Sequence, residues 1–138
     1  MKHAIVLPAL LLSVAALAAP PKTKLMDFST DLLISDAAAK AAMAERIPAK
    51  VWKIYPASKW AFVSQVEGGL TATGTCVITA RVMLLPLTPT MKAVMLRPEK
   101  TATAFDAQPG ASLDVCKALA KTKLQEATNA VVSTLVKV

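Results

Sequence analysis

The residue types that most often carry chemistry are scarce in this chain. It contains one histidine, His3, and two cysteines, Cys76 and Cys116. Histidine and cysteine supply much of the acid–base, nucleophilic and metal-binding chemistry of proteins. His3 lies in an N-terminal segment that we expect to be cut off, and we expect the two cysteines to be joined in a disulfide. We therefore predict no metal site and no cofactor.

The 40 positions between Cys76 and Cys116 argue for a structural disulfide. Redox-active pairs usually lie close together, as in the C-x-x-C motif. Closing a loop of this length stabilises a fold by about 4 kcal/mol in the loop-entropy model. The sequence predicts one structural disulfide.

Carboxylates are the remaining candidates for acid–base catalysis. A glycosidase-type pair needs two carboxyl groups within about 5–10 Å of each other in a cleft. We considered Asp31 with Asp106 and Glu67 with Glu99, and no pattern in the sequence places either pair together. The sequence also has no G-x-S-x-G elbow and no glycine-rich phosphate loop. We predict no catalytic residues and a protein that is not an enzyme.

The most suggestive stretch for binding runs from Lys50 to Phe62. It holds four of the six aromatic residues, interleaved with three lysines. Lysine attracts anionic groups, and Trp and Tyr offer flat amphipathic surfaces to sugars, lipids or a partner's side chains. The alternative is that Trp60 and Phe62 belong to the core and the lysines are only solvated. The predicted binding residues are Lys50, Trp52, Lys53, Tyr55, Lys59 and Trp60.

Two further surfaces are candidates for binding. Lys117, Lys121 and Lys123 form a basic ridge in the first half of the last predicted helix, where a merely solvated face is the alternative. The other surface is a methionine cluster on the predicted strands, formed by Met83, Met91 and Met95. The first helix, a second subunit or a hydrophobic ligand could cover it, and we predict the first helix.

The N-terminus has the pattern of an export signal. Met1-Lys2-His3 is followed by an apolar run, Ala4 to Leu17, which is shorter than the about 20 residues that span a bilayer. Ala16-Leu17-Ala18 offers small residues to a signal peptidase. We predict a signal peptide at residues 1–18, no transmembrane anchor and a periplasmic location, with extracellular as the alternative. Of the 16 basic residues 15 remain, against nine acidic ones, which leaves a net charge of +6.

Beyond the signal peptide we predict an extended leader at residues 19–34 and one α+β domain at residues 35–138. Ser35 or Asp36 caps a helix over residues 37–46, which Pro48 ends. Alternating apolar residues predict strands over 60–66 and 75–84, with further strands over 90–97 and 101–105. Gly68-Gly69 is predicted as a turn, and the order of strands suggests an antiparallel meander of three to four strands.

The last element is predicted to be a long helix capped by Ser112. Its apolar residues recur at steps of three and four, which traces one stripe: Leu113, Cys116, Ala120, Leu124, Ala127, Val131 and Leu135. Cys116 lies on this stripe, and Cys76 lies on the inward face of the strand over 75–84. A helix packed on the sheet brings the two cysteines together. The predicted fold class is therefore α+β, with an N-terminal helix, an antiparallel sheet, a C-terminal helix on the sheet and one disulfide.

These features favour a small periplasmic, non-catalytic binding protein that docks onto another cell-envelope component. Inhibitors and immunity-type proteins fall in this class. The alternative is a carrier of a hydrophobic or amphiphilic ligand, held between sheet and helix or on the methionine-lined face. Basic net charge favours an envelope protein or an anionic envelope component as partner. Nucleic acid is not expected in that compartment, and the sequence leaves the oligomeric state open.

Overall fold

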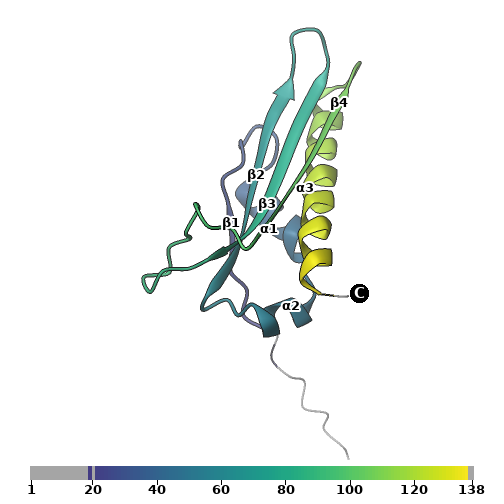
Figure 1. Ribbon diagram of the computed structural model, residues 1–138. Coiled ribbons are helices and arrows are strands. Elements are labelled where there is room, and N and C mark those ends of the chain that lie inside the picture. Colours follow the sequence, from purple (N-terminus) through teal and green to yellow (C-terminus); the bar gives the residue numbers. More distant parts are fainter. Residues whose placement is uncertain (1–18, 20, 137–138) are drawn as a thin grey trace, which may run out of the picture.

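The computed structural model describes Ala19 and residues 21–136, so the predicted signal peptide lies outside the described residues. A four-stranded sheet carries a long helix along one face, and two short helices lie between the first two strands in the sequence (Figure 1). The elements in chain order are β1 (Leu25–Asp27), α1 (Asp36–Ala44), α2 (Ala49–Ile54), β2 (Trp60–Leu70), β3 (Cys76–Pro86), β4 (Lys100–Gln108) and α3 (Leu113–Leu135).

The sheet is mixed, so the prediction of a purely antiparallel sheet was wrong. Its strand order is β1-β2-β3-β4, in which β2, β3 and β4 pair antiparallel and β1 pairs parallel with β2. Parallel neighbours need a crossover connection, and the segment with α1 and α2 provides it. β1 is formed by part of the range that was predicted as an extended leader.

Two local predictions in the sheet were also wrong. Gly68 and Gly69 lie inside β2 with φ of 116° and 147°, and the chain turns later, between Thr71 and Thr75. Residues 90–97 are not a strand but part of a loop, in which Leu87 and Ala93 form one isolated bridge. Both edges of β3 are already paired, with β2 and β4, so the apolar residues of 90–97 meet no free edge of β3 and did not extend the sheet.

The main core lies between the sheet and α3, which confirms the predicted α+β class and the packed C-terminal helix. The inward residues of β3 are fully buried, as are Cys116, Ala120 and Leu124 of α3. Cys76 and Cys116 form the predicted disulfide, with their Cα atoms 5.5 Å apart. Ser112 caps α3 by accepting a hydrogen bond from the N–H of Val115.

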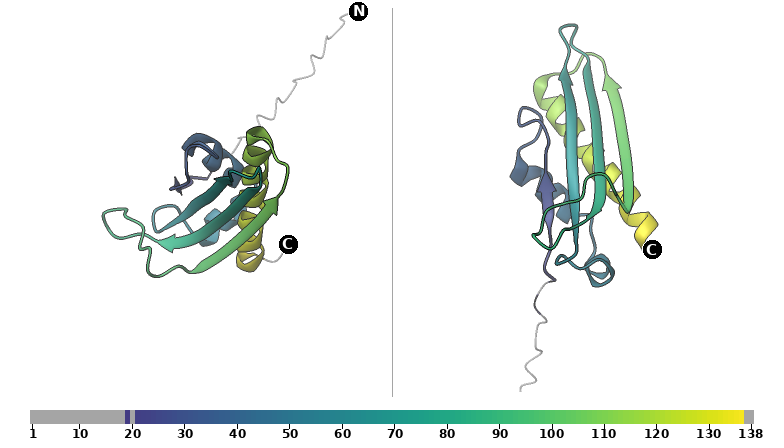
Figure 2. Two further views of the ribbon diagram at one scale, coloured as in Figure 1. Left: turned by 90° about the horizontal axis from the view of Figure 1, so that it is seen from above. Right: turned by 60° about the vertical axis from the view of Figure 1, so that its left-hand side comes forward.

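The short helices lie on the same side of the sheet as α3 (Figure 2). α1 begins after Ser35, whose side chain accepts from the N–H of Ala38, and its Ala39, Ala42 and Met43 are buried in the main core. The prediction that the first helix covers the second face of the sheet was therefore wrong.

That second, outer face carries a small core cluster of its own. Ala61, Val63, Met83 and Leu85 are buried there, and Leu87 and Ala93 from the following loop pack against them. A loop, rather than a helix, covers this end of the outer face. Farther along β3 the same face is open, and Val77 is 41% exposed.

Candidate functional site

The predicted binding segment folds into α2 and the turn that leads into β2. Sequence reasoning missed α2, because Pro48 was taken only as the end of a helix. Its fixed φ of −70° also places it at the N-cap of a new helix, over Ala49–Ile54. Trp52 points from this helix into the core, where it is 6% exposed and meets the Phe62 ring edge-on at 5.4 Å. In this arrangement Trp52 positions α2 on the sheet, and the small part of it that stays accessible lines a hollow beside α2.

Tyr55 and Trp60 form a half-buried aromatic pair at the surface. Their rings meet edge-to-face, with centroids 5.3 Å apart and an interplanar angle of 87°. Both residues flank a tight turn, in which the N–H groups of Lys59 and Trp60 donate to the carbonyl of Pro56 at 2.9 and 3.0 Å. The pair is therefore fixed before any partner arrives.

Exposed basic and apolar residues lie next to this pair in the sequence. Lys53 and Lys59 are exposed, and Ile54 is an apolar side chain that stays 58% exposed. Lys50 is exposed at the start of α2 and lines a neighbouring hollow. The structure thus places five of the six predicted binding residues at or near the surface of one end of the molecule, and puts the sixth, Trp52, in the core.

Two hollows flank the start of α2. The larger is an open hollow of about 460 Å³ between the α1–α2 connection and the last turns of α3. The smaller encloses about 240 Å³ between the same connection and the chain that enters β1, and Ile47 lines both. The residues of the larger hollow are Glu45, Arg46, Ile47, Pro48, Lys50, Asn129, Val132, Ser133 and Val136.

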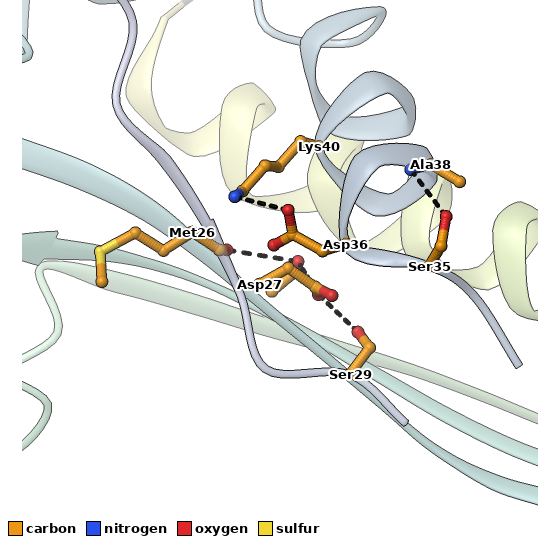
Figure 3. A network of polar contacts seen from close by, with 8 residues as sticks. Met26, Asp27, Ser29, Ser35, Asp36, Ala38 and Lys40 are labelled. Carbon is orange, nitrogen blue, oxygen red and sulfur yellow. Dashed lines mark hydrogen bonds and ion pairs between the residues drawn. The ribbon is translucent and has the colours of Figure 1, made fainter. Parts of the chain in front are cut away.

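A partly buried polar cluster joins β1 to β2, and sequence reasoning did not find it (Figure 3). Ser64 is fully buried and donates to Asp27 Oδ1 at 2.6 Å, while Ser29 donates to the same oxygen at 2.5 Å. Ser29 Oγ also accepts from the N–H of Val66 at 2.9 Å. The one available signal was Ser64, a polar residue between Phe62 and Val66 on an otherwise apolar strand face. Both hydroxyls are committed to one carboxylate, so we read the cluster as a lock between the two strands.

The basic ridge on α3 is partly neutralised. Lys123 forms ion pairs with Glu126 at 2.7 Å and Asp106 at 3.5 Å, and Lys121 lies 3.9 Å from Glu45. The hydrogen bond to Glu126 raises the pKa of Lys123 above its ordinary value. These neighbours make the ridge a poorer anion site than its sequence suggested.

The two carboxylate pairs considered from the sequence do not converge. Glu67 pairs with Thr79, whereas the N–H of Glu99 donates to the carbonyl of Leu84. Five residues along β3 separate these positions by about 17 Å. Asp31 follows β1 at one edge of the sheet, and Asp106 lies in β4 at the other edge. The sheet therefore does not bring the backbone positions of either pair together.

Comparison with known proteins gives only distant likenesses. The PelC dodecamer from Paraburkholderia phytofirmans aligns with a TM-score of 0.48 and 13% identity, over 83% of this chain and 89% of that chain. A Xanthomonas campestris protein described by the family model DUF330 aligns with a TM-score of 0.39 and 13% identity, over 84% of this chain and 86% of that chain. No protein-family model matches the sequence, and no curated protein matches it.

Proposed function

We propose that this chain is a small exported, non-catalytic binding protein that docks onto another component of the cell envelope. The class includes inhibitors and immunity-type proteins, and the partner is an envelope protein or an anionic envelope component. The Cys76–Cys116 disulfide supports a periplasmic or extracellular location, because disulfides persist in oxidising compartments. Within the part of the chain that the structure describes, no helix has the length and apolar character needed to cross a bilayer.

The observation that carries this proposal is the Tyr55–Trp60 pair with exposed lysines beside it. Tyr and Trp in fixed, partly desolvated positions are the residues that dominate protein interfaces. The turn at Pro56 already holds both rings, so little conformational entropy is lost when a partner binds. Lys53 and Lys59 add the positive charge that steers an anionic partner toward the rings.

The test is capture of the partner from the native envelope fraction by the disulfide-intact protein. A variant with Lys53→Glu and Lys59→Glu reverses the charge beside the aromatic pair. A matched control with Lys117→Glu and Lys121→Glu changes the net charge equally on α3. We expect one component to be captured by the parent and the control and lost from the first variant. Equal capture by both variants would show that docking uses another surface.

A second candidate function, a carrier of a hydrophobic or amphiphilic ligand, is favoured by the larger hollow. About 460 Å³ falls within the range of small-molecule sites, and the lining combines apolar Ile47 and Val132 with the charged Arg46 and Lys50. The space between the sheet and α3, one of the two places where a carrier was suggested to hold its ligand, is filled by core side chains.

Native mass spectrometry of freshly purified protein tests the carrier. Ser133 is exposed on α3 and lines the hollow, so Ser133→Trp would fill the space without disturbing the sheet. A co-purifying mass of a few hundred daltons that disappears in this variant supports a carrier. A bare parent chain supports docking instead.

A further inference from the structure

The loop between β3 and β4, residues 87–99, projects from the sheet; we call it the Met91 loop. It leaves the sheet at the end opposite the β2–β3 turn (Figures 1 and 2). Thr88 closes its tip, since its N–H donates to the carbonyl of Lys92 at 2.8 Å and its Oγ1 accepts from the N–H of Lys92 at 3.1 Å. At its base the N–H of Val94 donates to the carbonyl of Pro86 at 2.9 Å. The loop therefore has a defined shape.

The loop faces solvent with large apolar side chains. Leu96 is 94% exposed, Met95 is 47% exposed and Met91 is 42% exposed. Single exposed apolar residues are ordinary on protein surfaces, but three within six positions on one projecting loop form a patch. Each would gain free energy on entering an apolar phase. Three such side chains on one loop make it a candidate docking surface.

The charges on the same loop indicate what that is. Lys92 lies between Met91 and Met95 and Arg97 directly follows Leu96, and both are exposed. The one acidic residue of the loop is Glu99, at its end. Lys59, whose carbonyl accepts from the N–H of Leu87, adds a third cation next to the base of the loop. Apolar side chains with cations beside them match the interface of an anionic phospholipid bilayer, where apolar acyl chains lie beneath anionic headgroups.

Backbone geometry adds an independent observation. Met91 has φ of 61°, and it is the one non-glycine residue with positive φ in the part of the chain that the structure describes. L-residues with long side chains avoid this region, so the hydrogen bonds of Thr88 hold Met91 in a disfavoured conformation at the tip. Strained positions of this kind gather at functional sites. If the turn alone mattered, glycine would form it with less strain than methionine.

We propose that the Met91 loop docks the protein onto an anionic phospholipid bilayer. Met91, Met95 and Leu96 enter the interface between headgroups and acyl chains, and Lys92 and Arg97 contact lipid phosphates. This inference goes beyond the proposed function and does not require the Tyr55–Trp60 pair to bind a partner. Because Lys59 lies beside both surfaces, Leu96→Ser separates the two proposals: it should lose vesicle binding and keep the capture of a protein partner.

The test is co-sedimentation with vesicles of phosphatidylglycerol mixed with phosphatidylcholine, compared with pure phosphatidylcholine. The protein is purified from the cells that express it. Intact-mass measurement then checks that the parent and all variants begin at the same residue. Leu96→Ser removes the most exposed apolar side chain of the loop. Phe105→Ser is the matched control, because Phe105 is 78% exposed but lies on β4 away from the loop.

We expect the parent to bind the anionic vesicles and Leu96→Ser to lower the partition coefficient by about tenfold. Phe105→Ser should leave it unchanged. Replacing both Lys92 and Arg97 with glutamine should lower the partition coefficient by about fivefold per charge. Added salt should also lower the partition coefficient of the parent. Circular dichroism and an intact-mass check of the disulfide control for folding.

Three results would overturn the proposal. The first is no binding of the parent to anionic vesicles, which would leave a protein partner as the occupant of the loop. The second is equal loss of binding in Leu96→Ser and Phe105→Ser, which would mean that exposed apolar residues bind lipid anywhere on this surface. The third is equal binding to neutral and anionic vesicles, which would exclude the role of Lys92 and Arg97.

Discussion

Replacing Gly68 with alanine is a sharp test of how β2 meets β3. A Cβ added at Gly68 would lie 2.0 Å from the carbonyl oxygen of Val77 and 2.9 Å from its carbonyl carbon. Gly69, the next residue, also has positive φ, but a Cβ there meets nothing within 4 Å. The two glycines therefore share residue type, strand and backbone region, and differ in the room beside the Cα atom. Gly69→Ala is the matched control.

The expected cost follows from this geometry. Nonbonded heavy atoms pack at about 3.5 Å, so β2 and β3 must separate locally by about 1.5 Å to admit the new methyl group at Gly68. N–H···O hydrogen bonds do not tolerate such a shift, and two lost ladder bonds cost about 1 kcal/mol each. The strained φ adds about 1–3 kcal/mol at either glycine. Gly68→Ala should therefore cost about 2 kcal/mol more than Gly69→Ala.

Urea unfolding of the disulfide-intact protein, followed by circular dichroism, measures both costs. Equal m-values in the parent and both variants would show that the change lies in the native state. If the free energies of unfolding of the two variants agree within about 0.5 kcal/mol, the reasoning about Val77 is refuted. Retention of the parent's stability by Gly68→Ala would mean that the close approach of the two backbones is not present in solution.

Three further predictions concern single features of the fold. Replacing Cys76 and Cys116 together with alanine should lower the free energy of unfolding by about 4 kcal/mol in a urea titration, and a loss below about 1 kcal/mol would mean that the disulfide closes no costly loop. Met91→Gly should raise stability by about 1 kcal/mol, because glycine accepts the left-handed conformation, while vesicle binding falls; unchanged stability would contradict the strain at Met91. Ser64→Ala should cost about 1–2 kcal/mol in thermal unfolding, because Asp27 loses a buried donor, and no cost would mean that water replaces the hydroxyl.

The part of the fold that the sequence predicted is the part governed by periodicity. Cys116, Ala120 and Leu124 recur at helical steps, and all three are fully buried in α3. Cys76 and Ile78 alternate on one face of β3, so the disulfide followed from two patterns that agreed. Leu113, at the start of the same stripe, is 49% exposed, because the stripe begins before the helix reaches the core.

The candidate site shows where such reasoning stops. The pattern of lysines and aromatic residues singled out the stretch with Lys53 and Lys59 as a candidate, but it could not separate Trp52 from Trp60. Both are tryptophans in the same stretch, and only the direction of α2 sends Trp52 against Phe62. The Met91 loop was mistaken for a strand for a similar reason: its apolar residues fit a strand pattern, and whether a neighbouring strand is there to pair with them is not a local property.

By itself, the sequence determined the helical stripe of α3, the alternation of β3 and the disulfide that joins them, because these depend on residue types at fixed spacings along one segment. Only the tertiary structure decided that β1 runs parallel to β2, that α1 joins α3 on the inner face, and that Ser64 meets Asp27. These depend on contacts between segments far apart in the chain. Whether such contacts form depends on which apolar faces remain exposed to water once α3 has packed on the sheet, and no local pattern contains that information.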